Sequence, residues 1–133
     1  SSAQPAALFR AKGTGPETAT LTPVGKIDFP ALAPEGKDIW GKIVTGLDIS
    51  PDGSRFLAIT YVNAFEFPVD LAHETLKPTS EMIRGKDYRK IQLVKLPQQE
   101  SIAYLPHSQG FLYTTERKKH QIQPLMKVSC SDP

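Results

Sequence analysis

The stretch Thr45-Gly-Leu-Asp-Ile-Ser-Pro-Asp-Gly-Ser-Arg-Phe-Leu-Ala-Ile-Thr-Tyr61 contains two apolar runs separated by turn-forming residues. At its centre is Ser50-Pro-Asp-Gly53, where proline restricts φ, aspartate can bond its own backbone and glycine tolerates a positive φ. Two such runs joined by a turn of this composition predict a β-hairpin over residues 44–61.

The pattern returns 55 residues later in Glu100-Ser-Ile-Ala-Tyr-Leu-Pro-His-Ser-Gln-Gly-Phe-Leu-Tyr-Thr-Thr-Glu116. Pro106 aligns with Pro51, and Phe111 aligns with Phe56. His-Ser-Gln replaces the Asp-Gly turn, so the second copy is degraded. We nevertheless expect a second hairpin over residues 100–116.

The remaining chain predicts further short strands and one helix. Asp70 can cap a helix over residues 70–77, and Pro78 would end it. Alternating or short apolar runs predict strands over residues 6–11, 19–29, 63–69, 88–96 and 124–128.

The order of these elements also repeats. Ala7-Leu-Phe-Arg10, Ala64-Phe-Glu-Phe67 and Leu125-Met-Lys-Val128 each open a new unit. Four short strands in a period of about fifty residues are typical of propeller blades. We therefore predict an all-β fold: one domain over residues 1–133, with two four-stranded antiparallel propeller-type blades and one short helix. The two repeats cover about residues 6–69 and 64–128 and share strands.

The stretches Asp48-Ile-Ser-Pro-Asp-Gly53 and Gln99-Glu-Ser-Ile-Ala-Tyr-Leu-Pro106 resemble blades of six-bladed β-propellers. The similarity is to extracellular propellers of the phytase-like and esterase-like type, and it covers about residues 44–69 and 91–128. It implies secretion or a periplasmic location, whereas the residues themselves leave the compartment open. It also implies that acidic residues at the rim can hold calcium.

Two blades are about a third of a six-bladed ring and leave long sheet edges uncovered. The chain is therefore expected to be part of a longer propeller, or to form a homo-oligomer in which three copies close a ring. The fragment reading is favoured. The start at Ser1 rather than Met leaves open a leader or a larger N-terminal portion.

Composition argues against several classes of protein. Hydrophobic residues make up 39% of the chain and charged residues 23%, as in ordinary soluble domains. A net charge of +2 and the short basic run Arg117-Lys-Lys-His120 do not predict a nucleic-acid partner. No apolar run approaches the ~20 residues that span a bilayer. Cys130 is the only cysteine, which favours an unpaired thiol over pairing between chains.

Motifs of common catalytic and cofactor sites are missing from the sequence. It contains no Gly-x-Ser-x-Gly elbow, no nucleotide-binding glycine pattern, and no metal-ligand spacing among its 3 histidines. We assign no catalytic residue, no cofactor and no metal.

The candidate ligand-binding residues come from the hairpin geometry. With the second turn centred on Ser108, Glu100 lies opposite Glu116 at the rim of a propeller channel. Opposed like charges are destabilising unless a cation, a shared proton or a basic neighbour lies between them. A calcium site is one interpretation. The other, which we prefer, is a slipped register or neutralisation by Arg117 or Lys118.

Four further residues are candidates. Thr45 and Tyr61 occupy the corresponding places in the first hairpin. Asn63 could line the same rim or serve as a turn residue, and Trp40 could stack on a ligand or cap the core, which is preferred. Asp48 is instead expected to accept a hydrogen bond from the backbone of a neighbouring blade.

These observations predict a non-catalytic, propeller-derived module that binds a ligand or partner, including copies of itself, through exposed blade edges. The alternative is a part of a calcium-dependent hydrolase of the phytase-like or esterase-like kind.

Overall fold

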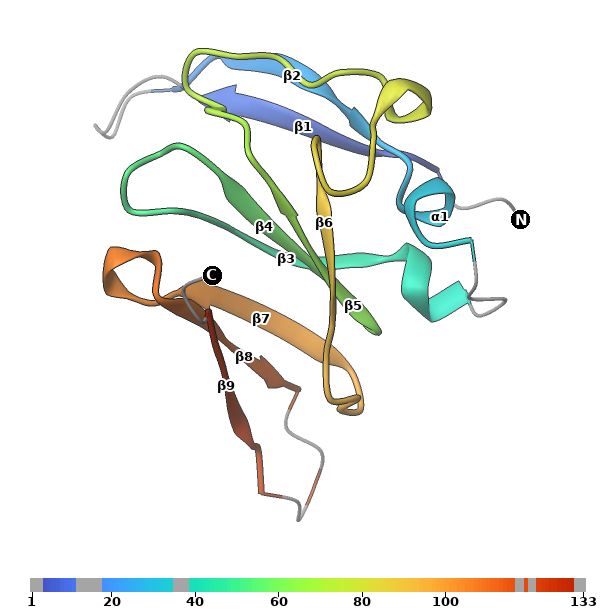
Figure 1. Ribbon diagram of the computed structural model, residues 1–133, viewed down its shortest axis with the longest axis vertical. Coiled ribbons are helices and arrows are strands. Elements are labelled where there is room, and N and C mark those ends of the chain that lie inside the picture. Colours follow the sequence, from blue (N-terminus) through green and yellow to red (C-terminus); the bar gives the residue numbers. More distant parts are fainter. Residues whose placement is uncertain (1–3, 12–17, 35–38, 117–118, 120–121, 131–133) are drawn as a thin grey trace.

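The computed structural model of the chain describes residues 4–11, 18–34, 39–116, 119 and 122–130. Within them the strands form three antiparallel sheets, as Figure 1 shows. The first sheet contains β1 (Ala6–Ala11) and β2 (Leu21–Ile27), the second β3 (Val44–Ile49), β4 (Phe56–Thr60), β5 (Asn63–Phe67) and β6 (Arg89–Gln92), and the third β7 (Gln99–Tyr104), β8 (Gly110–Thr115) and β9 (Leu125–Ser129).

The predicted all-β class is confirmed, but the division into two four-stranded blades is only partly right. Only the central sheet has four strands in the described part of the chain; the other sheets have two and three. Each sheet is a meander in which consecutive strands along the chain pair antiparallel; the longest connection, between β5 and β6, contains η2.

The central sheet is packed on both faces. On the side of β1 and β2, its core contains Phe29, Phe56 and Phe67, with the rings of Phe56 and Phe67 stacked at 4.7 Å. On the side of β7 and β8, Leu57 and Phe111 belong to a second core. All five residues of β4 are therefore buried, since neither of its faces reaches water. Figure 1 shows the corresponding order of the three sheets.

The prediction of a helix over residues 70–77 is wrong. Asp70 starts a single turn, accepting backbone hydrogen bonds from His73 at 3.1 Å and Glu74 at 2.8 Å. The chain then leaves that turn because the N–H of Leu76 donates to the carbonyl of Val24 in β2 at 2.7 Å. Tertiary pairing therefore overrides a short and weak helical pattern.

The short helix lies elsewhere, as α1 (Phe29–Leu32). Asp28 caps it by accepting a hydrogen bond from the N–H of Ala31, and Pro30 stands in its first turn. Phe29 and Leu32 are buried, so core packing rather than length stabilises this turn. The 3-10 turns are η1 (Ile39–Lys42), η2 (Thr79–Glu81) and η3 (Pro106–Ser108).

The strand boundaries agree well in the two hairpins and less well elsewhere. The predicted strand over residues 88–96 is cut to β6, and Val94 beyond it is 65% exposed. The predicted run over residues 19–29 becomes β2, and the ladder between β1 and β2 is irregular at Leu8 and Phe9, opposite Pro23. None of the described helices is long and apolar enough to cross a membrane.

Candidate functional site

Two carboxylates predicted to oppose each other do not do so. Gln99 pairs with Thr115, and Ser101 pairs with Thr114, so Glu100 is the extra residue of a bulge. The N–H of Glu116 donates to the carbonyl of Gln98 at 3.0 Å. Glu100 and Glu116 are not opposed because this bulge shifts the register of the hairpin by one residue. A slipped register is the alternative preferred in the sequence analysis.

Tyr61 contacts the first of these two carboxylates. Its hydroxyl donates to Oε1 of Glu100 at 3.4 Å. Burial raises the pKa of Tyr61, and the negative charges of Glu100 and Glu116 raise it further. The structure therefore brings three of the candidate residues into one electrostatic neighbourhood, near the turn between β4 and β5.

The hydroxyl of Thr45 is used in a hydrogen bond between two sheets. Its Oγ1 donates to the carbonyl of Gln99 at 2.6 Å, which links β3 to β7. Asn63 is 8% exposed, and its N–H donates to Oγ1 of Thr60 at 3.0 Å, as expected for a turn residue. Trp40 belongs to η1, but its side chain is outside the described part of the structure.

Sequence reasoning missed Gln99, which is fully buried. Its Nε2 donates to the carbonyl of Thr60 at 3.2 Å, and its Oε1 accepts from the N–H of Leu96 at 3.2 Å. The one signal in the sequence is the repeat, because the offset of 55 residues pairs Gln99 with the apolar Val44. A polar residue at an apolar position suggests a buried hydrogen-bonding role.

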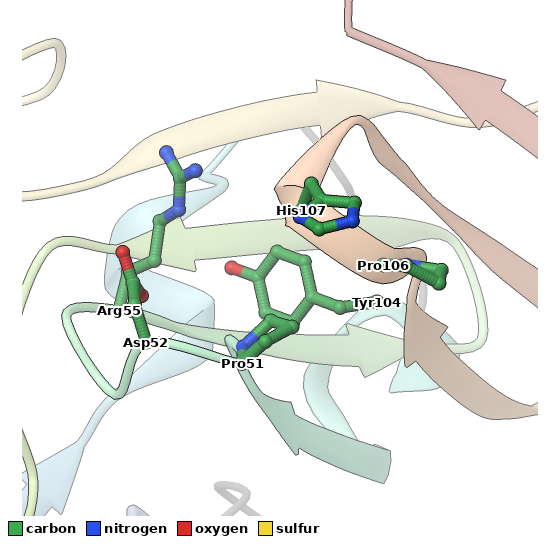
Figure 2. A pocket seen from close by; sticks show the side chains of 6 residues that line it. All are labelled: Pro51, Asp52, Arg55, Tyr104, Pro106 and His107. Atoms are coloured by element: carbon green, nitrogen blue, oxygen red, sulfur yellow. The ribbon is translucent and has the colours of Figure 1, made fainter.

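A pocket of about 770 Å³ lies where the second and third sheets meet at their hairpin turns (Figure 2). Its walls come from the two turns that the repeat relates and from the end of β7. Its lining residues are Pro51, Asp52, Arg55, Tyr104, Pro106 and His107.

One side of this pocket contains a polar chain across the two sheets. The hydroxyl of Tyr104 donates to Oε1 of Glu66 at 2.9 Å, and Nε of Arg55 lies 3.5 Å from the same oxygen. Burial, followed by the hydrogen bond to Glu66, raises the pKa of Tyr104. Tyr104 therefore stays a neutral hydrogen-bond donor at physiological pH. Nε of Arg55 is buried and has no hydrogen-bond acceptor among the described residues, since its contact with Glu66 is an ion pair only.

Asp52 supplies a negative charge at the pocket's edge at neutral pH. Its Oδ1 accepts hydrogen bonds from Oγ of Ser50 at 2.7 Å, and from the N–H and Oγ of Ser54 at 3.0 and 2.8 Å. The bond from Ser50 and those from Ser54 lower the pKa of Asp52 to about 2. These groups give the pocket the chemistry of polar recognition.

The prediction for Asp48 is confirmed. Its Oδ2 accepts a 2.7 Å hydrogen bond from the N–H of Tyr104, across the boundary between the second and third sheets. Among the described residues, no group of three or more His, Cys, Asp or Glu side chains is placed to hold a metal ion.

A second cavity, of about 660 Å³, lies between β1 and β3. Its lining is mostly apolar and includes Ala7, Leu8, Val24, Leu47, Ile49 and Leu71. Leu47 is 43% exposed and Ile49 is 47% exposed, although both lie on a central sheet whose β4 is fully buried. We call this cavity the β1/β3 groove.

Comparison with known proteins identifies no matching family model, no matching curated protein and no matching solved structure.

Proposed function

We propose that this chain is a non-catalytic module of β-propeller type that binds a partner through the β1/β3 groove. One observation carries the proposal: the groove is mostly apolar and none of the described residues covers it, and Leu47 and Ile49 are nearly half exposed on the same sheet face as the buried Phe56 and Ala58. A large exposed apolar surface of this kind marks interaction sites in soluble proteins.

The sheet edges beside the groove support the same proposal. β1 pairs only with β2, and β3 pairs only with β4, in the part of the chain that the structure describes. Edge strands present unpaired N–H and C=O groups, which natural proteins cover or protect by other means. Partners that supply strands satisfy these groups and bury the groove together.

The partner is either the rest of a longer propeller or further copies of this chain. In a ring of six blades, three copies with two blades each would close a trimer. In both cases the polar pocket beside Tyr104 remains at the hairpin ends and is available to a ligand. The proposed module would also expose Tyr61, Glu100 and Glu116 at the rim as a second polar surface.

Light scattering and an apolar dye test this proposal together. The wild-type chain is expected to bind the dye in the groove. The double variant Leu47→Lys/Ile49→Lys is expected to lose this binding and to keep its circular dichroism spectrum. Wild-type behaviour in the double variant would overturn the groove as the binding surface. A mass three times that of the chain would identify the ring.

A calcium-dependent hydrolase is the second candidate. It is favoured by the hydroxyl of Tyr61, which donates to Oε1 of Glu100 at 3.4 Å and whose pKa is raised by burial and by the negative charges of Glu100 and Glu116. Calcium titration followed by calorimetry, with Glu100→Gln/Glu116→Gln as the control, tests it. Calcium binding that the double variant loses, together with phosphoester turnover that EDTA stops, would establish this activity; heat equal to the buffer blank would exclude it.

A further inference from the structure

The exposed side chains of β3, Leu47 and Ile49, correspond to less exposed side chains of β7 in the next repeat. The offset of 55 residues places Ile102 of β7 where Leu47 stands in β3, and Tyr104 where Ile49 stands. Ile102 is 8% exposed because it packs against the face of β4 that carries Leu57 and Ile59. Leu47, at 43%, lacks such a neighbour among the described residues.

The hydrogen-bond register of the two hairpins is also the same. The N–H of Ser50 donates to the carbonyl of Arg55 at 2.9 Å, and the N–H of Leu105 donates to the carbonyl of Gly110 at 2.9 Å. In an antiparallel ladder the preceding residue then directs its own N–H away from the partner strand. In β7 that outward N–H belongs to Tyr104, and Asp48 accepts its bond. In β3 it belongs to Ile49, on the edge that has no partner strand in the described chain.

The neighbouring edge of β1 completes the arrangement. The strand Ala7–Arg10 aligns with Ala64–Phe67 of β5, and β1 pairs with β2 as β5 pairs with β6. In the central sheet, β4 occupies the other edge of β5. The equivalent edge of β1 has no strand in the described residues, so the position for a β4-like strand lies beside the groove.

We propose that the β1/β3 groove binds an antiparallel β-hairpin of the same repeat type, provided by chain outside these 133 residues. Its first strand supplies an aspartate that accepts the N–H of Ile49, as Asp48 accepts that of Tyr104. Its second strand pairs along β1 and covers Leu47 with aliphatic side chains. This inference rests on the proposed function and specifies the partner.

A second copy of the chain fits this position less well. Its own Asp48 is already bonded to its own Tyr104. The residue that the repeat places at the same point of β7 is Ala103, which has no acceptor side chain. The aspartate therefore has to come from a further repeat, and the chain's own β3–β4 hairpin is the nearest available mimic of it.

The experiment uses a peptide with the sequence of residues 43–61, closed by backbone cyclisation, and the full isotope-labelled chain. We expect amide shifts at Leu47 and Ile49, and at least tenfold slower amide exchange at Ile49. The peptide carrying Asp48→Ala is expected to bind about tenfold more weakly and to leave Ile49 unprotected, whereas Ile43→Ala, at an exposed position before β3, changes neither value. In the chain, Ile49→Lys is expected to abolish binding, and the exposed Val94→Lys is expected to preserve it.

Three results would overturn the inference. The first is that millimolar peptide does not change the amide chemical shifts of Leu47 and Ile49. The second is that the Asp48→Ala peptide slows amide exchange at Ile49 as much as the wild-type peptide does, and the third is that self-associated chain without peptide slows it, which would make a second copy the occupant. The dye and light-scattering comparison of wild type with Leu47→Lys/Ile49→Lys is independent of the peptide. It separates failure of this inference from failure of the proposed function.

Discussion

Asp48 of β3 and Tyr104 of β7 are joined by a 2.7 Å hydrogen bond from the backbone N–H of Tyr104 to the carboxylate. The hydroxyl of the same tyrosine donates to Glu66 of β5, so one residue of the third sheet is attached at two points to the central sheet. The boundary between two sheets is therefore held by polar contacts as well as by the apolar core around Leu57 and Phe111.

Replacing Asp48 is expected to destabilise the chain. Asp48→Ala leaves the N–H of Tyr104 without its acceptor and is expected to lower the free energy of unfolding by about 2 kcal/mol. Asp48→Asn keeps a carbonyl oxygen and is expected to cost less than half of that. Urea unfolding measures both values; equal losses in the two variants would contradict a hydrogen-bonding role.

Removing the hydroxyl of Tyr104 is expected to weaken the same boundary. Tyr104→Phe takes a donor from Glu66, whose side chain is 14% exposed, and is expected to cost about 1–2 kcal/mol. Tyr61→Phe is the matched control, because its bond to Glu100 is long at 3.4 Å, and it is expected to cost less than ~0.5 kcal/mol. A double-mutant cycle of Tyr104→Phe with Glu66→Gln should give a coupling energy clearly different from zero.

Gln99 is expected to tolerate no apolar replacement. Gln99→Leu preserves the volume but removes the partners of Thr60 and Leu96, and it is expected to cost about 2–3 kcal/mol. Gln92→Leu, on an exposed position of β6, is the control and is expected to change stability by less than ~0.5 kcal/mol. Chemical denaturation of both variants would refute the buried role if their midpoints were the same.

Two glycines with positive φ are expected to respond very differently to alanine. At Gly110, with φ of +143°, an added Cβ would lie 2.0 Å from the carbonyl oxygen of Val128 in β9. Gly110→Ala is therefore expected to cost more than ~2 kcal/mol and to disturb the pairing of β8 with β9. Gly53→Ala, with φ of +73° and open space around the Cβ, is expected to cost only ~1 kcal/mol. Thermal unfolding compares them, and a larger loss at Gly53 would refute the steric argument.

Acidification is expected to weaken the first hairpin turn through Asp52. Its pKa is lowered from 3.8 to about 2 in the folded chain, so its contribution is complete above the unfolded value and is lost as the pH falls toward 2. Asp70 and Asp87 also have lowered pKa values, so wild-type stability falls in an overlapping range. Stability measured between pH 5 and about pH 2 should therefore fall less steeply in Asp52→Asn than in wild type. Equal slopes would show that the hydrogen bonds from Ser50 and Ser54 do not favour the ionised form.

The misplaced helix and the slipped register have related causes. The pattern over residues 70–77 is locally compatible with a helix, but the N–H of Leu76 finds an acceptor in β2. The register of Glu100 depends on a bulge beside Gln99, whose side chain bonds to the carbonyl of Thr60 in another sheet. Neither partner is near in sequence, so no local pattern predicts either feature.

The sequence by itself determined the all-β class, both hairpins, the repeat of 55 residues and the role of Asp48. Turn chemistry and the period of two act over a few residues, so they can be recognised without a structure. Only the tertiary structure decided that the sheets of the described residues have two, four and three strands, that Gln99 is buried, and that none of these residues closes the β1/β3 groove. Those features depend on which faces of the sheets pack together. The hydrogen bonds that join the sheets, such as Gln99 to Thr60 and Tyr104 to Asp48, connect residues 39 and 56 positions apart. Packing between distant segments therefore selects these features, and local propensity does not.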